Sequence, residues 1–223
     1  MAIHLSELFG SASIGVYMLT TESFAILPKS APERKILQFE KSLEVDPVVT
    51  NIGASVLVGV LCAANSNGII LPYIVRDEEV TAIKSALKIN VTVMESKETA
   101  FGNMILSNDR GSLVSPHMNR KDIKLVEDTL GVEAAKGRIA NLWYVGSLAV
   151  ATNQGALTHP LIRDKERELL EDVLKVKATP GTVNGGIPYV ATGLRCNSRH
   201  AEVGFITTGP ELFIIENALN VVG

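Results

Sequence analysis

The chain of 223 residues has few cysteines and few aromatic residues: two cysteines, one tryptophan and 5% aromatics in all. Cys62 and Cys196 lie far apart in apolar surroundings, which favours reduced, packed thiols in a cytosolic protein over a disulfide framework. The sequence also lacks CxxC and HExxH motifs, a Walker loop, a dinucleotide-binding glycine fingerprint and a nucleophile elbow. The four histidines do not have metal-ligand spacing, so we expect neither a metal nor a cofactor.

The chain also lacks a basic excess and a long hydrophobic run. Its 21 Lys and Arg face 24 Asp and Glu, and the net charge of −3 argues against DNA binding or a general RNA coat. The longest apolar stretch, residues 54–64, is too short for the ~20 residues of a membrane helix, and the N-terminus does not resemble a signal peptide. With 46% hydrophobic residues, the composition predicts a soluble, cytoplasmic chain with a packed core and no membrane contact.

A repeat of about 44 residues runs through the whole chain. Four prolines that end apolar runs are each 44 residues apart: Pro28, Pro72, Pro116 and Pro160. Glycines and leucines recur at nearly the same interval, as Gly15, Gly59, Gly102, Gly146 and Gly193, and as Leu43, Leu87, Leu130, Leu174 and Leu219. A period of this length is typical of propellers and other repeat architectures.

Each repeat has the same internal order. A glycine opens a short apolar strand, an Asn- or Gly-containing turn follows, and a second apolar strand ends at the proline, as expected for a hairpin. An amphipathic helix comes next, with Asp77, Asn119 and Asp164 as candidate N-caps. Thr208 and Glu211 have the spacing of a capping box. A short β-rich run closes the unit, which is therefore ββαβ.

No such unit can bury its helix face and both strand faces alone, so neighbouring units must pack together. Closure into a ring removes exposed sheet edges, and we therefore predict an α/β fold in a single domain, a five-bladed pseudo-fivefold propeller of ββαβ modules. The modules are expected at residues 1–49, 50–95, 96–139, 140–183 and 184–223. The first and fifth are irregular, with the turn TTES in the first and the long turn NSRHAEVG in the fifth. They mark either a functional region or the seam of the ring, and the pseudosymmetry predicts two ends of similar composition.

Two histidines and one cysteine suggest a possible catalytic group. His117 follows Pro116 and His159 precedes Pro160, so the repeat places them in similar parts of adjacent modules. One interpretation is a general base acting with Cys196 as nucleophile. The interpretation we favour is that both are strand-end histidines that hydrogen-bond to loop backbone.

Basic and aromatic groups suggest a second kind of site. Arg195, Arg199 and His200 cluster at the fifth turn, while Arg120, Lys121 and Lys124 begin the third helix. These residues form either a phosphate-contacting patch or, as we favour, a solvated face. Trp143 and Tyr144 begin the fourth module, where packing is a better explanation than base stacking.

Long motifs in a fixed order resemble the archaeal translation initiation factor 6 family. They are TNIGASVLVGVLCAANSNGIILP, TAFGNMILSNDRGSLVSP, VGSLAVATNQGALTHP, ATPGTVNGG and TTGPELFIIENAL, and the match runs from about Ile14 to Leu219. The resemblance implies the pentein fold, which this family shares with guanidine-modifying enzymes. It also implies a non-enzymatic, monomeric initiation factor that binds the large (50S) ribosomal subunit and blocks premature association with the small (30S) subunit, with a further role in ribosome biogenesis. The implied partners are a ribosomal protein near the sarcin–ricin loop and nearby rRNA.

The same resemblance suggests a ribosome-binding region. The Gly102-Asn103 step matches the GN step of the family, so Asn103 is the first candidate for the interface, although it is also explained as a turn asparagine. Thr50 and Asn51 match a family segment at the entry to the second module, where they are interface residues or structural ones. The alternative function is a pentein-fold enzyme that modifies a guanidino or amidino substrate through Cys196.

Overall fold

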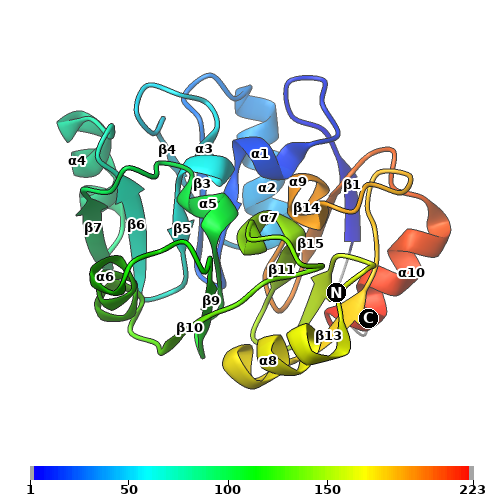
Figure 1. The fold of residues 1–223 in the computed structure, drawn as a ribbon. Coiled ribbons are helices and arrows are strands. Elements are labelled where there is room, and N and C mark those ends of the chain that lie inside the picture. Colours follow the sequence, from blue (N-terminus) through cyan, green and yellow to red (C-terminus); the bar gives the residue numbers. More distant parts are fainter. Residues whose placement is uncertain (1–2, 221–223) are drawn as a thin grey trace.

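The computed structural model describes residues 3–220 and contains five three-stranded sheets around a central axis (Figure 1). In each sheet an inner strand pairs antiparallel with a middle strand, which pairs parallel with an outer strand. The inner strands are β2 (Leu19–Thr20), β5 (Ala63–Ala64), β8 (Ile105–Ser107), β11 (Ala149–Ala151) and β14 (Leu194–Cys196). The middle strands are β3 (Phe24–Leu27), β6 (Gly68–Pro72), β9 (Ser112–Val114), β12 (Gly155–Thr158) and β15 (Ala201–Gly204). The predicted α/β class and pseudo-fivefold arrangement are confirmed.

The outer strands include one from the opposite end of the sequence. They are β4 (Asp46–Val49), β7 (Asn90–Met94), β10 (Ala134–Lys136), β13 (Lys177–Pro180) and β1 (Ile3–Ser6). Strand β1 pairs parallel with β15, with Ile3 opposite Ala201 and Ser6 opposite Gly204. The N-terminal strand therefore completes the fifth sheet, so the ring has its seam there. We call the sheets and their helices blades 1 to 5, beginning with β2–β4 and ending with β14, β15 and β1.

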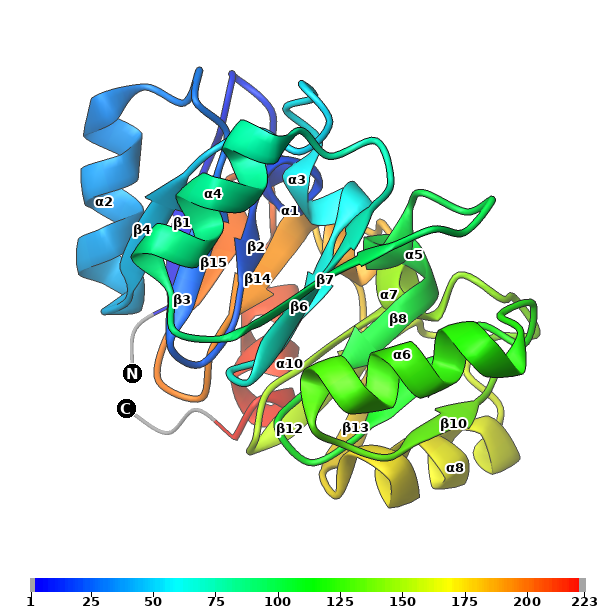
Figure 2. The ribbon, with the colours of Figure 1, turned by 90° about the vertical axis from the view of Figure 1, so that its left-hand side faces the viewer.

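In residues 3–220, five long helices and five short ones are present; the long helices cover the outside of the ring and the short ones lie near the axis (Figures 1 and 2). The long ones are α2 (Glu33–Leu43), α4 (Asp77–Ala86), α6 (Arg120–Leu130), α8 (Asp164–Leu174) and α10 (Gly209–Ala218). All but α10 connect a middle strand to the parallel outer strand of the same blade, as parallel pairing requires. The short ones are α1 (Ile14–Tyr17), α3 (Val58–Leu61), α5 (Phe101–Met104), α7 (Val145–Leu148) and α9 (Val190–Gly193).

The hydrophobic core lies largely between neighbouring blades. Ile26 and Phe24 of blade 1, for example, are buried in the same cluster as Ile69 and Ile83 of blade 2. Each blade therefore depends on the next for burial, as the repeat predicts. Within residues 3–220, no helix has the length and apolarity needed to cross a membrane.

The helix starts differ in part from the prediction. Asn119 is the N-cap of α6, and its Oδ1 accepts a hydrogen bond from the Asp122 N–H at 2.9 Å. Asp77 and Asp164 were predicted as N-caps but are the first residues of their helices. In both helices the carboxylate of a glutamate two residues farther on accepts the backbone N–H of the N-cap arginine, which is the reciprocal half of a capping box.

The repeated glycines and two turns also differ from the prediction. Each repeated glycine lies in a short helix; the first four lie about one turn before the strand that they were expected to open, and Gly193 directly precedes its strand. The long fifth turn is only four residues, 197–200, because Ala201 already begins β15. In the first hairpin turn, the Thr21 hydroxyl accepts hydrogen bonds from the backbone N–H groups of Ser23 and Phe24. In the second hairpin turn, the Asn65 amide oxygen accepts from the two equivalent N–H groups. A threonine can thus replace the asparagine of this motif.

Candidate functional site

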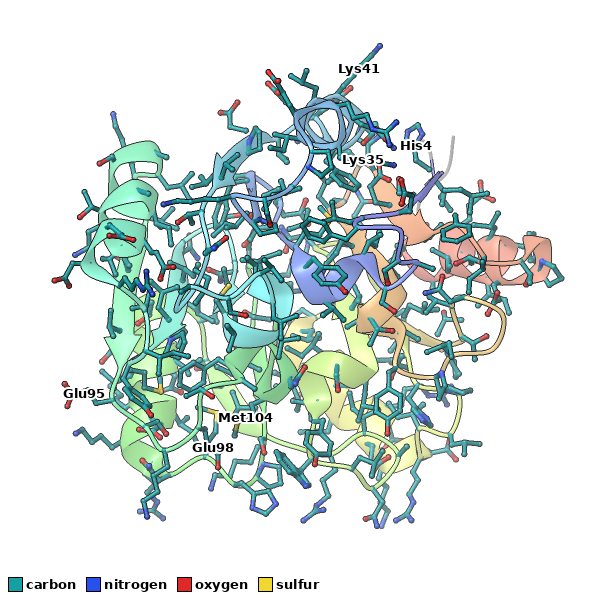
Figure 3. The ribbon with its side chains drawn as sticks, turned by 90° about the horizontal axis from the view of Figure 1, so that it is seen from above. His4, Lys35, Lys41, Glu95, Glu98 and Met104 are labelled. Carbon is teal, nitrogen blue, oxygen red and sulfur yellow. The ribbon has the colours of Figure 1, made fainter. Side chains whose placement is uncertain are left out.

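The short helices form a closed ring at one end of the axis. Each contacts the next, and α9 contacts α1. A Cβ atom added at Gly59, Gly102 or Gly146 would lie 2.0, 2.1 or 2.2 Å from the carbonyl oxygen of the preceding ring glycine. These positions therefore admit only glycine, because any side chain would force neighbouring backbones apart. We call this end, with the loops that precede the short helices, the helical end; Figure 3 is viewed onto it.

A small hollow on the axis opens at the helical end, and we call it the mouth. It is lined by one side chain from each short helix: Val16, Val60, Asn103, Ser147 and Thr192. Each of these residues follows a ring glycine or, in α9, Ala191. The hydroxyls of Ser147 and Thr192 donate to carbonyl oxygens of Tyr144 and Tyr189. The Asn103 side-chain amide has no hydrogen-bond partner within residues 3–220 and is partly exposed, so it is free to bind a partner molecule.

Exposed apolar side chains lie in the loops of the helical end. Leu57, Tyr144 and Tyr189 directly precede three of the short helices and are 37%, 36% and 41% exposed. Phe9 and Ile187 lie in the loops of the same end, and the Phe9 ring packs edge-on against Tyr17 at 5.2 Å. We call these five residues, Phe9, Leu57, Tyr144, Ile187 and Tyr189, the apolar rim. Apolar side chains exposed together at one end of a protein are typical of interaction surfaces.

The opposite end, formed by the hairpin turns 21–23, 65–67, 108–111, 152–154 and 197–200, is polar. The Asp109 carboxylate accepts from the Ser66 N–H at 2.8 Å and from Asn153 Nδ2 at 2.7 Å. The Glu22 carboxylate accepts from the Ser198 N–H at 2.8 Å and from the Asn153 N–H at 3.0 Å. These bonds join turns of different blades. We call this the turn end; it differs clearly from the apolar helical end, so the expectation of two similar ends is wrong.

Between the two ends lies an axial cavity of about 60 Å³. Arg195 enters it from β14 and donates from Nε to the Met18 carbonyl at 2.9 Å and from Nη2 to the Gly15 carbonyl at 2.6 Å. Burial lowers the pKa of Arg195 to about 10, and the guanidinium stays charged at neutral pH. Arg199 instead lies at the turn end, where its Nη2 donates to the Glu44 carbonyl oxygen. The two arginines predicted to share one patch therefore face different surroundings.

Cys62 and Cys196 also line the axial cavity, and both thiols are free and buried. Burial raises the pKa of Cys62 to about 12 and raises that of Cys196 as well, which suppresses the nucleophilic thiolate. Neither candidate base lies in the lining of this cavity. His159 Nδ1 accepts the Leu161 N–H at 3.1 Å, the loop-backbone contact that we favoured, and His117 packs against Trp143 at the edge of blade 3.

The other predicted site residues have clear structural positions. Thr50 is fully buried, and Asn51 accepts the Lys29 N–H through Oδ1 at 3.0 Å. Gly102 belongs to the ring contact described above. Of the four candidates, only Asn103 presents an uncommitted side chain at the mouth. The sequence did not indicate the apolar rim, because its residues come from loops of four blades; aromatic residues just before the short helices were the one available signal.

Trp143 and Tyr144 stack on each other, with ring centroids 3.6 Å apart. Trp143 is partly buried by this contact and by His117, as packing predicts, whereas Tyr144 is exposed in the rim. The pair therefore connects the interior of the ring to the helical end.

Comparison with known proteins identifies relatives along the whole chain. The model of the eIF-6 family matches residues 3–218. Translation initiation factor 6 of Methanocaldococcus jannaschii is 47% identical over 220 residues, which are 96% of each chain. Translation initiation factor 6 of Pyrococcus furiosus is 44% identical over 227 residues, covering 100% of both, and that of Nitrosopumilus maritimus is 44% identical over 212 residues, 95% of this chain and 96% of the relative.

Proposed function

The chain belongs to the eIF-6 family of translation initiation factors, and on this basis we propose that it binds the large ribosomal subunit and prevents premature association with the small subunit. The factor acts as a monomer, in the cytoplasm, and without catalysis, since the buried thiols and the separated histidines provide no reactive group. By occupying the large subunit before joining, it also takes part in the biogenesis of that subunit.

The observation that carries this proposal is the contrast between the two ends of the ring. The helical end has the apolar rim and the uncommitted Asn103 amide, whereas the carboxylates of the turn end are already hydrogen-bonded. Desolvating apolar surface stabilises a complex, while exposed, satisfied polar groups gain little from a partner. We therefore place the subunit on the helical end, in a contact of about 800 Å² per partner.

The net charge of −3 suits a basic ribosomal protein, near the sarcin–ricin loop, as the main contact, with rRNA close by. The helical end is shaped by three of the candidate residues, Gly102, Thr50 and Asn51. Gly102 keeps the short helices close together, and the Asn51 contact holds the loop that leads to α3. Asn103 is the residue of the four that makes direct contact.

Co-sedimentation tests the proposal directly. The purified protein is mixed with isolated large subunits, small subunits are added last, and the extent of joining is scored. We expect the protein to sediment with large subunits only and to reduce joining. A protein that stays in the supernatant at low and moderate salt would refute the proposed function.

A matched pair of variants tests the location. Asn103→Arg places a long charged side chain at the mouth, whereas Gln154→Arg makes the same amide-to-arginine change on an exposed residue of the turn end. We expect Asn103→Arg to weaken subunit binding by about tenfold or more, as for central interface residues, and Gln154→Arg to bind like the wild type. Equal melting temperatures would show that both variants are folded. The opposite pattern would place the subunit on the turn end.

A further inference from the structure

Within residues 3–220, the partly buried guanidinium of Arg195 forms no salt bridge with an acidic side chain. It donates from Nε and Nη2 to carbonyl oxygens of Met18, Gly15 and, at 3.4 Å, Gly59. These contacts join blade 5 to blades 1 and 2. Nη1 has no hydrogen-bond partner within residues 3–220, and no acidic residue of that range lines the axial cavity. The two N–H groups of Nη1 are thus available to a ligand in the axial cavity.

A second donor in the same cavity has no acceptor either. The hydroxyl oxygen of Thr20, on β2, is buried and has no hydrogen-bond partner in the described chain. Buried hydroxyls without a partner are uncommon, and one that lines a cavity indicates a bound group there. The hydroxyl and the guanidinium come from neighbouring blades, 1 and 5.

The remaining groups of the cavity carry no negative charge at neutral pH. Burial keeps Cys62 and Cys196 as thiols, and the Cys62 thiol already donates to the Val58 carbonyl oxygen. The nearest acidic residues, Glu22 and Asp109, line a smaller adjoining space toward the turn end. Both are held by the hydrogen bonds between turns described above, so neither reaches Arg195 as a counterion.

We propose that the axial cavity binds one small inorganic anion, such as chloride, with the Arg195 guanidinium and the Thr20 hydroxyl as donors. The cavity of about 60 Å³ is several times the ~15 Å³ that a single water requires, so a halide with one or more waters fits. The anion neutralises the guanidinium at the point where blades 5, 1 and 2 meet. It therefore stabilises the closed ring, independently of any contact with the ribosome.

Crystallography with bromide tests the site. Crystals of the protein are grown with bromide as the halide, and an anomalous difference map is calculated. We expect one bromide peak within hydrogen-bonding distance of Arg195 Nη1. Density for water alone in the cavity, at a bromide concentration that labels surface sites, would overturn the proposal.

Thermal unfolding provides a second measurement on the same protein. At constant ionic strength, replacing gluconate, which is too large for the cavity, by bromide should raise the melting temperature by roughly 5–10 °C at saturation. Arg195→Met should abolish this increase, whereas Arg199→Met, on the exposed arginine of the turn end, should retain it. If Arg195→Met fails to fold, Thr20→Val removes only the hydroxyl and should shift the bromide midpoint to higher concentration. The same bromide response in every variant would show that halide acts elsewhere.

Discussion

Replacing Gly102 by alanine should destabilise the ring without touching the hydrophobic core. The added Cβ would lie 2.1 Å from the Gly59 carbonyl oxygen and 2.9 Å from those of Val60 and Cys62. A comfortable carbon–oxygen contact needs about 3.3 Å, so α5 and α3 must separate by roughly 1 Å. Since the ring is closed, such a shift also disturbs α7 on the other side.

The expected cost follows from these contacts. Forcing extra volume into a packed site costs about 1–3 kcal/mol, and the upper part of this range applies because the obstructing atoms are backbone. Alanine recovers about 1 kcal/mol through its helix propensity. We therefore expect a net loss of about 2 kcal/mol, or roughly 4–8 °C in melting temperature for a chain of this size.

Calorimetry or circular dichroism measures this loss, and Gly209→Ala is the matched control. Gly209 also lies in a helix, α10, but a Cβ added there meets nothing within 4 Å. The control should therefore melt at or slightly above the wild-type temperature. If Gly102→Ala also melted there, the close approach of the short helices would not be what makes glycine necessary.

Two further predictions concern titration and reactivity. Burial alone would raise the pKa of Glu211, but hydrogen bonds from Thr208, Thr182 and Gly186 lower it to about 2. A carboxyl with an unfolded pKa near 4.5 then contributes about 3 kcal/mol above that pH, and this contribution is lost as the pH falls toward 2. Glu211→Gln should thus be less stable than the wild type at pH 7 and nearly equal to it near pH 2, as measured by urea unfolding; a constant difference across this range would contradict the assignment. Cys196 should resist iodoacetamide in the native protein and react in urea, as followed by mass spectrometry. Rapid native alkylation of Cys196 would instead restore the enzymatic alternative.

The repeat was sufficient to predict the ring because its spacing reflects contacts that every blade must make. Prolines and glycines at fixed intervals mark the ends of hairpins and the close packing of backbone. Local errors arose where two side chains can perform one task. Thr21 and Thr152, for example, close hairpin turns that elsewhere use asparagine.

The candidate site was predicted less completely than the fold. Asn103 was identified through the GN step, and its side chain lines the mouth at the helical end. Thr50 was selected by the same reasoning, yet it is fully buried. A motif match in one sequence does not distinguish a residue that packs in the core from a residue that contacts a partner.

By itself, the sequence determined the number of blades and the order of the three strands and the long helix within each, because these depend on local patterns repeated along the chain. Only the tertiary structure decided that β1 closes the fifth sheet, that Arg195 lies in the axial cavity and that the two ends differ. Each of these depends on residues far apart in sequence, such as Gly15 and Arg195. The physical reason is that a closed ring brings the first and last blades into contact, and no periodicity specifies which side chains meet there.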